Sequence, residues 1–189
     1  MLFGDAPLEM DVLAQTLLER VRPIAKAVEE RNPQSSPTPW TRAVYQVLRE
    51  LGCGLGFDVY SCLPDCHGEW LFDTVWKRKT GDLALVAESE WAQATKEILY
   101  DFRKVLIAKA PIKLLVYDGG DEECCSQSIR NAIEECMEAY SAHVPGESYL
   151  LVSFGPTSQY AHSFTVPDGV VPSIKFTSVG RAFSGMAAH

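Results

Sequence analysis

The chain has 189 residues, of which 47% are hydrophobic and 22% charged, a composition typical of one folded domain with a sizeable core. No apolar run approaches the roughly 20 residues that span a bilayer, and the N-terminus lacks the features of a signal peptide, so we expect a cytoplasmic protein with no membrane partner. The net charge of −8 argues against a broad nucleic-acid-binding surface, although it leaves room for a local basic patch.

The first part of the chain predicts two helices. Apolar residues recur at helical spacing over residues 8–30 and again over residues 40–51. Pro23 falls inside the first span, where we expect a kink or a break, and Gly52 is expected to end the second helix. Residues 32–39, which are rich in Pro and Ser, predict an irregular loop between the two helices.

Strands dominate the middle of the chain. We predict three of them, because β-branched and aromatic residues are frequent between breaks at Pro64, Gly68 and Gly81. The pattern continues with a helix, a strand, a helix and a strand, and two more short strands are expected near the C-terminus. In chain order the predicted strands and helices cover residues 56–63, 69–78, 82–91, 92–110, 112–117, 122–142, 149–154, 163–166 and 173–178.

This order of elements predicts a mixed α/β sheet flanked by helices. The short links make the first three strands antiparallel neighbours, and the helical crossover makes the fourth strand parallel to the third. We expect a single domain over residues 1–189. Within it, residues 1–39 form an N-terminal helical extension and residues 155–189 form a C-terminal elaboration.

Three acidic residues on neighbouring predicted strands are candidate metal ligands. Glu88 and Glu90 share one face of their strand, because side chains two positions apart point the same way, and Asp73 lies on the strand before. Carboxylate oxygens suit Mg²⁺ or Mn²⁺, and such an ion can activate water for attack on a phosphoryl group. The alternative is a set of acids on a solvent-facing side of the sheet. The apolar run from Leu83 to Ala87 favours the metal site, because acids at the end of a buried strand repel one another unless a cation or a proton intervenes.

With Asp73 followed fifteen positions later by Glu88-Ser89-Glu90, the chain resembles the PD-(D/E)XK nuclease superfamily, which includes many restriction endonucleases. The resemblance covers residues 40–117, whose order of helix, three strands, helix and strand is that of the superfamily core. It implies a restriction endonuclease-like fold in which Asp73 and Glu88 are metal ligands. Glu90 stands where most members have lysine, although some restriction enzymes also have glutamate there. Glu50 matches the acidic residue that many members carry in the first core helix.

The helix after the acids offers a replacement for the missing lysine. Glu97, Asp101 and Lys104 share one helical face, and Lys104 reaches the acids if that face turns toward them. The alternative is an ordinary surface helix with exposed ion pairs. Lys113 and Lys77 are weaker candidates for the same role.

A different metal site is conceivable at Cys62, Cys66 and His67, whose close spacing suggests zinc. No second pair at ligand spacing completes a tetrahedral site, so we rank zinc below the carboxylate site and expect free thiols.

Two functions follow from these patterns. The first is a metal-dependent nuclease that hydrolyses phosphodiester bonds, with DNA as the expected substrate and partner and with Asp73, Glu88, Glu90 and Lys104 as catalytic residues. The second is a catalytically inactive protein of nuclease fold with a binding or regulatory role, which the acidic net charge and the missing lysine favour. Either form is compatible with a homodimer.

Overall fold

The structure is a computed structural model that describes residues 9–31, 38–63, 66–68, 70–120, 123–169 and 173–183. The helices in these ranges are α1 (Met10–Arg31), α2 (Pro39–Gly54), α3 (Thr95–Ile107) and α4 (Glu123–Glu138). The strands are β1 (Asp58–Ser61), β2 (Thr74–Lys77), β3 (Leu83–Glu90), β4 (Ile112–Asp118), β5 (Ser148–Phe154), β6 (Ser158–Thr165) and β7 (Thr177–Phe183).

All of these strands belong to one mixed sheet, in which they lie side by side in chain order. β1, β2 and β3 are antiparallel neighbours, and β4 and β5 continue the sheet parallel to β3. β6 and β7 return to antiparallel pairing. The expected α/β class is therefore confirmed, as is the change from antiparallel to parallel pairing at β3.

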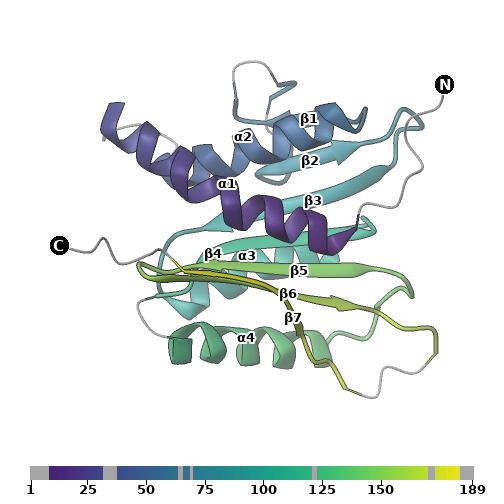
Figure 1. The fold of residues 1–189 in the computed structure, drawn as a ribbon. Coiled ribbons are helices and arrows are strands. Elements are labelled where there is room, and N and C mark those ends of the chain that lie inside the picture. Colours follow the sequence, from purple (N-terminus) through teal and green to yellow (C-terminus); the bar gives the residue numbers. More distant parts are fainter. Residues whose placement is uncertain are drawn as a thin grey trace.

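Helices cover both faces of the sheet, as Figure 1 shows, and the core has two halves accordingly. One half lies between the sheet and the pair α1 and α2, and includes Leu17, Leu48 and Trp76. The other lies between the sheet and the pair α3 and α4, and includes Val86, Phe102 and Ile133. Since β3 has a helical layer on each side, its residues from 84 to 88 are all buried.

The first helix lies close to its predicted position, and the second is longer than the sequence predicted. α1 continues through Pro23 without a break, because Pro23 is on the exposed side, where the carbonyl that loses its hydrogen bond can reach water. α2 begins at Pro39 after the N-cap Thr38 and ends at Gly54. The expected stop at Gly52 was wrong, since Gly52 is buried inside the helix. Among the described helices, none is both long and apolar enough to cross a membrane.

The C-terminal strands differ most from the sequence prediction. β6 begins five residues earlier than residue 163, and β7 begins four residues later than residue 173. In β6 the polar residues Gln159 and His162 are buried, which hides the alternation that usually marks a strand. At β7, α1 lies so close that a Cβ on Gly180 would be 2.7 Å from Leu18 Cδ1. Long-range packing rather than local pattern therefore decides these strands.

Candidate functional site

The end of β3 carries two acidic side chains toward α3. Val86 packs in the half of the core that α3 covers, and Glu88 and Glu90 follow it at intervals of two on the same strand. Glu88 is 2% exposed, whereas Glu90, nearer the end of the strand, is half-buried. The expected common face therefore points into the layer between the sheet and α3, and not to solvent.

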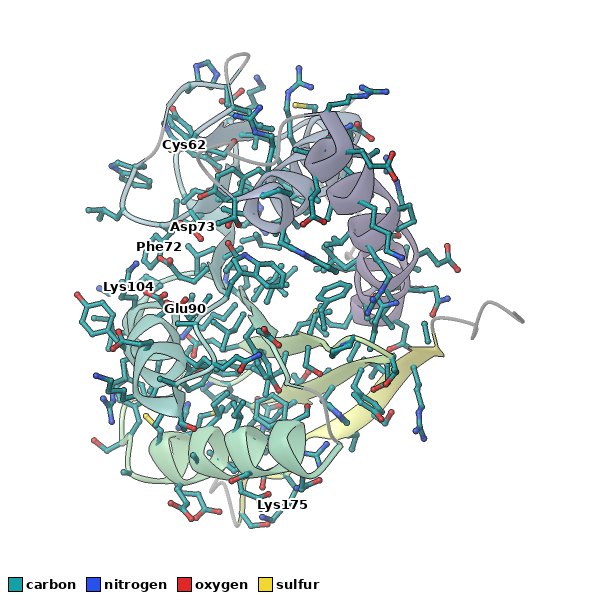
Figure 2. All side chains as sticks on the ribbon, turned by 90° about the vertical axis from the view of Figure 1, so that its left-hand side faces the viewer. Cys62, Phe72, Asp73, Glu90, Lys104 and Lys175 are labelled. Carbon is teal, nitrogen blue, oxygen red and sulfur yellow. The ribbon has the colours of Figure 1, made fainter. Side chains whose placement is uncertain are left out.

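Lys104 of α3 reaches this layer. Its Nζ lies 2.8 Å from Glu88 Oε1 and 3.2 Å from Asp101 Oδ1. Asp101 was noted in the sequence only as a residue on the same helical face as Lys104. In the structure it also forms a hydrogen bond with Glu90, so α3 contributes both a cation and a third acid to the cluster. Figure 2 places Lys104, Glu90 and Asp73 in one region of the molecule.

Burial changes the protonation of Glu88. It raises the pKa of this carboxyl to about 8, although the contact with Lys104 acts in the opposite direction, and the negative charge of Asp73 raises it further. For Lys104, burial lowers the pKa, but the nearby Glu88 and Asp101 outweigh it and leave the pKa above its ordinary value. Glu88 thus holds a proton near neutral pH that an exposed glutamate has already lost.

Glu90 has a raised pKa for related reasons. Burial is the main cause, and the hydrogen bond and charge of Asp101 add to it. One oxygen of Glu90 accepts a hydrogen bond from the backbone N–H of Ala92 at 2.7 Å, which stabilises the ionised form and fixes the carboxylate. Glu90 therefore keeps its proton more readily than an exposed glutamate does.

Asp73 does not lie on a strand, and the prediction of a strand over residues 69–78 was wrong for residues 70–73, while residue 69 lies outside the described ranges. β2 begins at Thr74, where its backbone pairing with β3 also begins. Just before this point, the side chain of Asp73 and not its backbone bonds to β3. Its Oδ2 accepts hydrogen bonds from both the backbone N–H and the hydroxyl of Ser89, each at 2.8 Å. Burial raises the pKa of Asp73, and the hydrogen bonds from Ser89 and Tyr45 offset part of this rise.

The carboxylate oxygens of these acids are the kind of ligand that a hard cation prefers. Glu88 Oε1 is buried and lacks a well-aligned hydrogen-bond donor despite its short contact with Lys104, and the oxygens nearby are carboxylates. Within the described ranges, however, no three or more His, Cys, Asp or Glu side chains are arranged to hold one ion. Asp73 is directed at Ser89, and Glu88 faces Lys104. The residues thus fit a cation in chemistry, although Asp73 and Glu88 are each turned toward a neighbouring side chain.

The other sequence candidates lie outside this cluster. Lys113 is buried on β4, where its Nζ donates to Glu147 at 2.8 Å and to Tyr149 at 3.1 Å. Lys77 lies over the ring of Tyr60. Glu50, the expected acid of the first core helix, forms an ion pair with Arg20 of α1. From α2 it is Tyr45 that reaches the site, through Asp73.

The cysteine candidates give no sign of a zinc site in the described part of the chain. Cys66 packs against the core, and His67 lies against the ring of Tyr60 at 5.0 Å between centroids. Cys62 is exposed.

Sequence reasoning missed Tyr45 as a partner of Asp73 and Asp101 as a partner of Glu90. Asp101 could have been found, since it lies one helical turn before Lys104. Residues three positions apart share a helical face, so a face that carries Lys104 to the buried acids also carries Asp101 there. Tyr45 carries no such signal, because an aromatic residue on the apolar side of a helix is indistinguishable from a core residue.

The sequence and structure of this chain match no known family, curated protein or solved structure.

Proposed function

We propose that this chain is a divalent-metal-dependent nuclease of restriction endonuclease-like fold, which hydrolyses phosphodiester bonds of DNA. The observation that carries the proposal is Glu88, a buried carboxylate with one poorly satisfied oxygen, at the end of β3 and in contact with Lys104. A buried acid of this kind, next to two others and one lysine, is expensive for stability and typical of a catalytic site.

The order of elements supports the same proposal. From α2 to β4 the chain has a helix, three antiparallel strands, a helix and a parallel strand, which is the core order of the PD-(D/E)XK superfamily that the motif resembles. Asp73 precedes β2 and Glu88 ends the buried part of β3, so the motif residues fall where adjacent strands of that core come together.

Each residue has a distinct role in this reaction. Asp73, Glu88 and Glu90 would hold Mg²⁺ or Mn²⁺, which when bound polarises the phosphate and lowers the pKa of water. To hold the cation, Glu88 would have to be ionised. Glu90, fixed by the Ala92 N–H, accepts a proton from the attacking water.

Lys104 takes the place of the lysine that Glu90 replaces in the motif. Its ammonium is held by Asp101, and it turns from Glu88 toward the negative charge that develops on the phosphate. Because it is 36% exposed at the side chain, Lys104 can move without opening the core.

The test is cleavage of plasmid, linear and single-stranded DNA by the whole chain, with Mg²⁺ or Mn²⁺ at pH 8. Glu88→Gln and Lys104→Met should each lower the rate by about 100-fold or more, as loss of a metal ligand or of a charge-stabilising group does. Glu97→Gln and Lys96→Met are the matched controls on the same helix and should cleave at the normal rate. The proposal fails if the wild-type chain leaves all DNA intact, or if Glu88→Gln cleaves as fast as the wild type.

A second function keeps the fold without the catalysis. Glu88 already lies against Lys104, and Glu90 occupies the position where lysine is usual, which favours an inactive nuclease-like protein that binds a partner. On that account Glu88→Gln leaves the biological activity unchanged. Loss of that activity in a folded Glu88→Gln variant would exclude it.

A further inference from the structure

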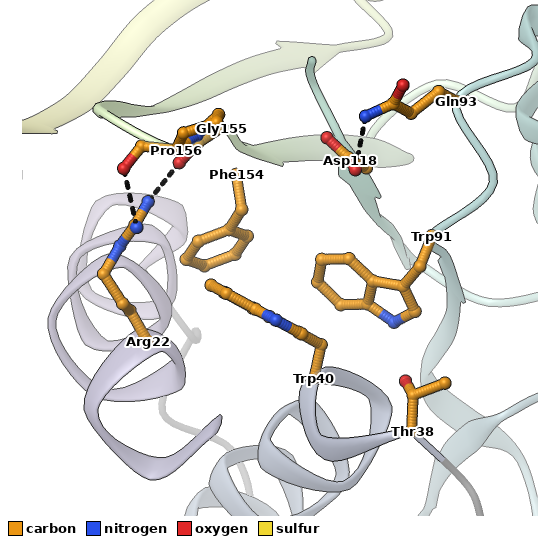
Figure 3. A pocket seen from close by; sticks show the side chains of 9 residues that line it. All are labelled: Arg22, Thr38, Trp40, Trp91, Gln93, Asp118, Phe154, Gly155 and Pro156. Atoms are coloured by element: carbon orange, nitrogen blue, oxygen red, sulfur yellow. Dashed lines mark hydrogen bonds between the residues drawn. The ribbon is translucent and has the colours of Figure 1, made fainter. Parts of the chain in front are cut away.

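A cavity of about 350 Å³ opens at the other face of the sheet, between α1 and α2 and the carboxyl ends of β3, β4 and β5. Figure 3 shows the residues that define it, which come from all five of these elements or directly follow them. Its lining includes Arg22, Trp40, Trp91, Gln93, Asp118 and Phe154. The carboxyl ends of parallel strands are where open α/β sheets usually bind ligands, and the volume is that of a small-molecule site.

Aromatic rings form one side of this cavity. The ring centroids of Trp40 and Trp91 are 5.3 Å apart, and those of Trp40 and Phe154 are 5.6 Å apart. The ring planes are tilted, by 43° between Trp40 and Trp91 and by 55° between Trp40 and Phe154, so a flat ligand stacks on one indole and meets the other at its edge. Trp40 and Trp91 are both half-buried, which leaves part of each indole open to the cavity. A nucleobase gains roughly 1–3 kcal/mol from such stacking.

A second side offers hydrogen-bond acceptors. Asp118 Oδ1 accepts from the Gly120 N–H at 2.8 Å, and Oδ2 accepts from Gln93 Nε2 at 3.2 Å. Each carboxylate oxygen has a further lone pair. This side therefore matches a ligand edge with two adjacent N–H groups. Guanine has such an edge, whereas adenine presents a single amino group there.

Arg22 supplies the opposite end with positive charge. Its guanidinium lies 5.6 Å from the Trp40 ring centroid and donates to the carbonyls of Pro156 and Gly155. With the Gln159 amide oriented to accept from Nε, acceptors in the described part of the chain account for three of its five N–H groups. Among the described residues no carboxylate forms an ion pair with Arg22, and burial lowers its pKa. An anionic group on the ligand would compensate this charge.

We propose that this cavity binds a guanine nucleotide unit, with the base stacked on Trp91 and its edge against Trp40, its N–H edge at Asp118 and its phosphate toward Arg22. The unit is either a free mononucleotide or an unpaired nucleotide of a nucleic-acid strand, since both present the same groups. The site uses none of the residues of the acidic cluster, so it does not rest on the proposed catalysis. Trp91 follows Glu90 directly, and the two sites lie on opposite faces at one end of β3.

The test is calorimetric titration of the whole chain with GMP, AMP and inorganic phosphate, in EDTA so that no metal takes part. GMP should bind at least about tenfold more tightly than AMP, because AMP leaves an acceptor of the Asp118 side unpaired. Asp118→Asn keeps the shape and the acceptor for Gly120 but should reduce the preference for GMP to about twofold or less. Trp91→Leu should weaken GMP binding by about tenfold, whereas Trp70→Leu, at an exposed tryptophan elsewhere, should not change it.

A single-stranded oligonucleotide with one guanine and its fully paired duplex distinguish the two sources. Tighter binding of the single strand than of GMP identifies a strand, and binding of GMP alone identifies a free nucleotide. The inference is overturned if GMP gives no saturable heat up to about 10 mM, if phosphate binds as tightly as GMP, or if Asp118→Asn keeps the full preference. Glu88→Gln must bind GMP normally, so failure of the nuclease proposal leaves this result unaffected.

Discussion

Glu88 places a carboxyl group between β3 and α3, where the residue is 2% exposed and one of its oxygens lacks a well-aligned donor. Such a group costs stability when it is ionised, because the charge leaves water for a layer in which only Lys104 faces it. Its folded-state pKa of about 8 lies above the ordinary value of 4.5. Near neutral pH the acid is therefore ready to exchange a proton for a cation.

The pKa of Glu88 predicts a particular dependence of stability on pH. Between pH 4.5 and 8 the folded state keeps this proton and the unfolded state loses it, so the favourable contribution is complete below pH 4.5 and is lost as the pH rises toward 8. Glu88→Gln cannot ionise. Its unfolding free energy relative to the wild type should rise by up to about 1.4 kcal/mol per pH unit over that window and level off above it.

Urea denaturation of both proteins at pH 5, 6, 7, 8 and 9 measures this difference, and Glu97→Gln on α3 serves as the control. A difference between Glu88→Gln and wild type that stays constant from pH 5 to 9 would show that Glu88 ionises as in water and would remove the basis for its role.

At the scale of elements, α2 packs closely on β1 and β2 through Gly52. A Cβ at this position would be 2.6 Å from Trp76 Nε1 and 2.7 Å from Val59 Cγ2. Both neighbours are buried and cannot move aside freely. Gly52→Ala should therefore lower the unfolding free energy by about 1–3 kcal/mol through overpacking.

Gly54 on the same helix is the matched control. Nothing lies within 4 Å of a Cβ built there, so Gly54→Ala should leave stability unchanged or raise it by up to about 1 kcal/mol, because alanine favours the helical backbone. Thermal or urea unfolding of the two variants decides the point. Equal effects at Gly52 and Gly54 would contradict the close packing of α2.

The sequence predicted a helix or strand well where its apolar residues, as spaced along the chain, are also the ones that pack in the core. α2 and β3 carry one apolar stripe and one continuous apolar run, and both lie near their predicted positions. The segment before β2 misled the prediction, because Phe72 and Trp70 look like strand residues although Asp73 replaces the backbone pairing with its side chain. The start of β7 was missed because contact with α1, distant in sequence, determines it.

At the scale of the whole molecule, the sheet separates two candidate sites that share its β3 end. The acidic cluster lies on the α3 face, and the aromatic cavity lies on the face of α1 and α2. The sequence predicted the first from the spacing of Glu88 and Glu90 on a buried strand, together with the reach of Lys104. The second could not be read from it, since Arg22, Trp91 and Phe154 are brought together only by the order of the strands.

The net charge of −8 bears on how such a molecule meets a substrate. On the nuclease proposal the substrate is DNA, which an acidic surface repels at long range, so its binding would come from a few placed groups and from a cation held by the acids. A cation that occupies the Glu88 cluster removes part of the local negative charge and makes that region more favourable for phosphate. The proposed nuclease activity therefore requires, first of all, that the acidic cluster bind a divalent ion.

Binding of Mn²⁺ to the whole chain at pH 6 and pH 8 tests this claim most directly, by calorimetry or by the loss of the free-ion resonance. Entry of Mn²⁺ displaces the Glu88 proton, so a group with a pKa of about 8 predicts affinity on the order of 50-fold higher at pH 8 than at pH 6. Glu88→Gln should lose most of this binding, and Glu97→Gln should keep it. Equal affinity at both pH values, or undiminished binding by Glu88→Gln, would contradict the account.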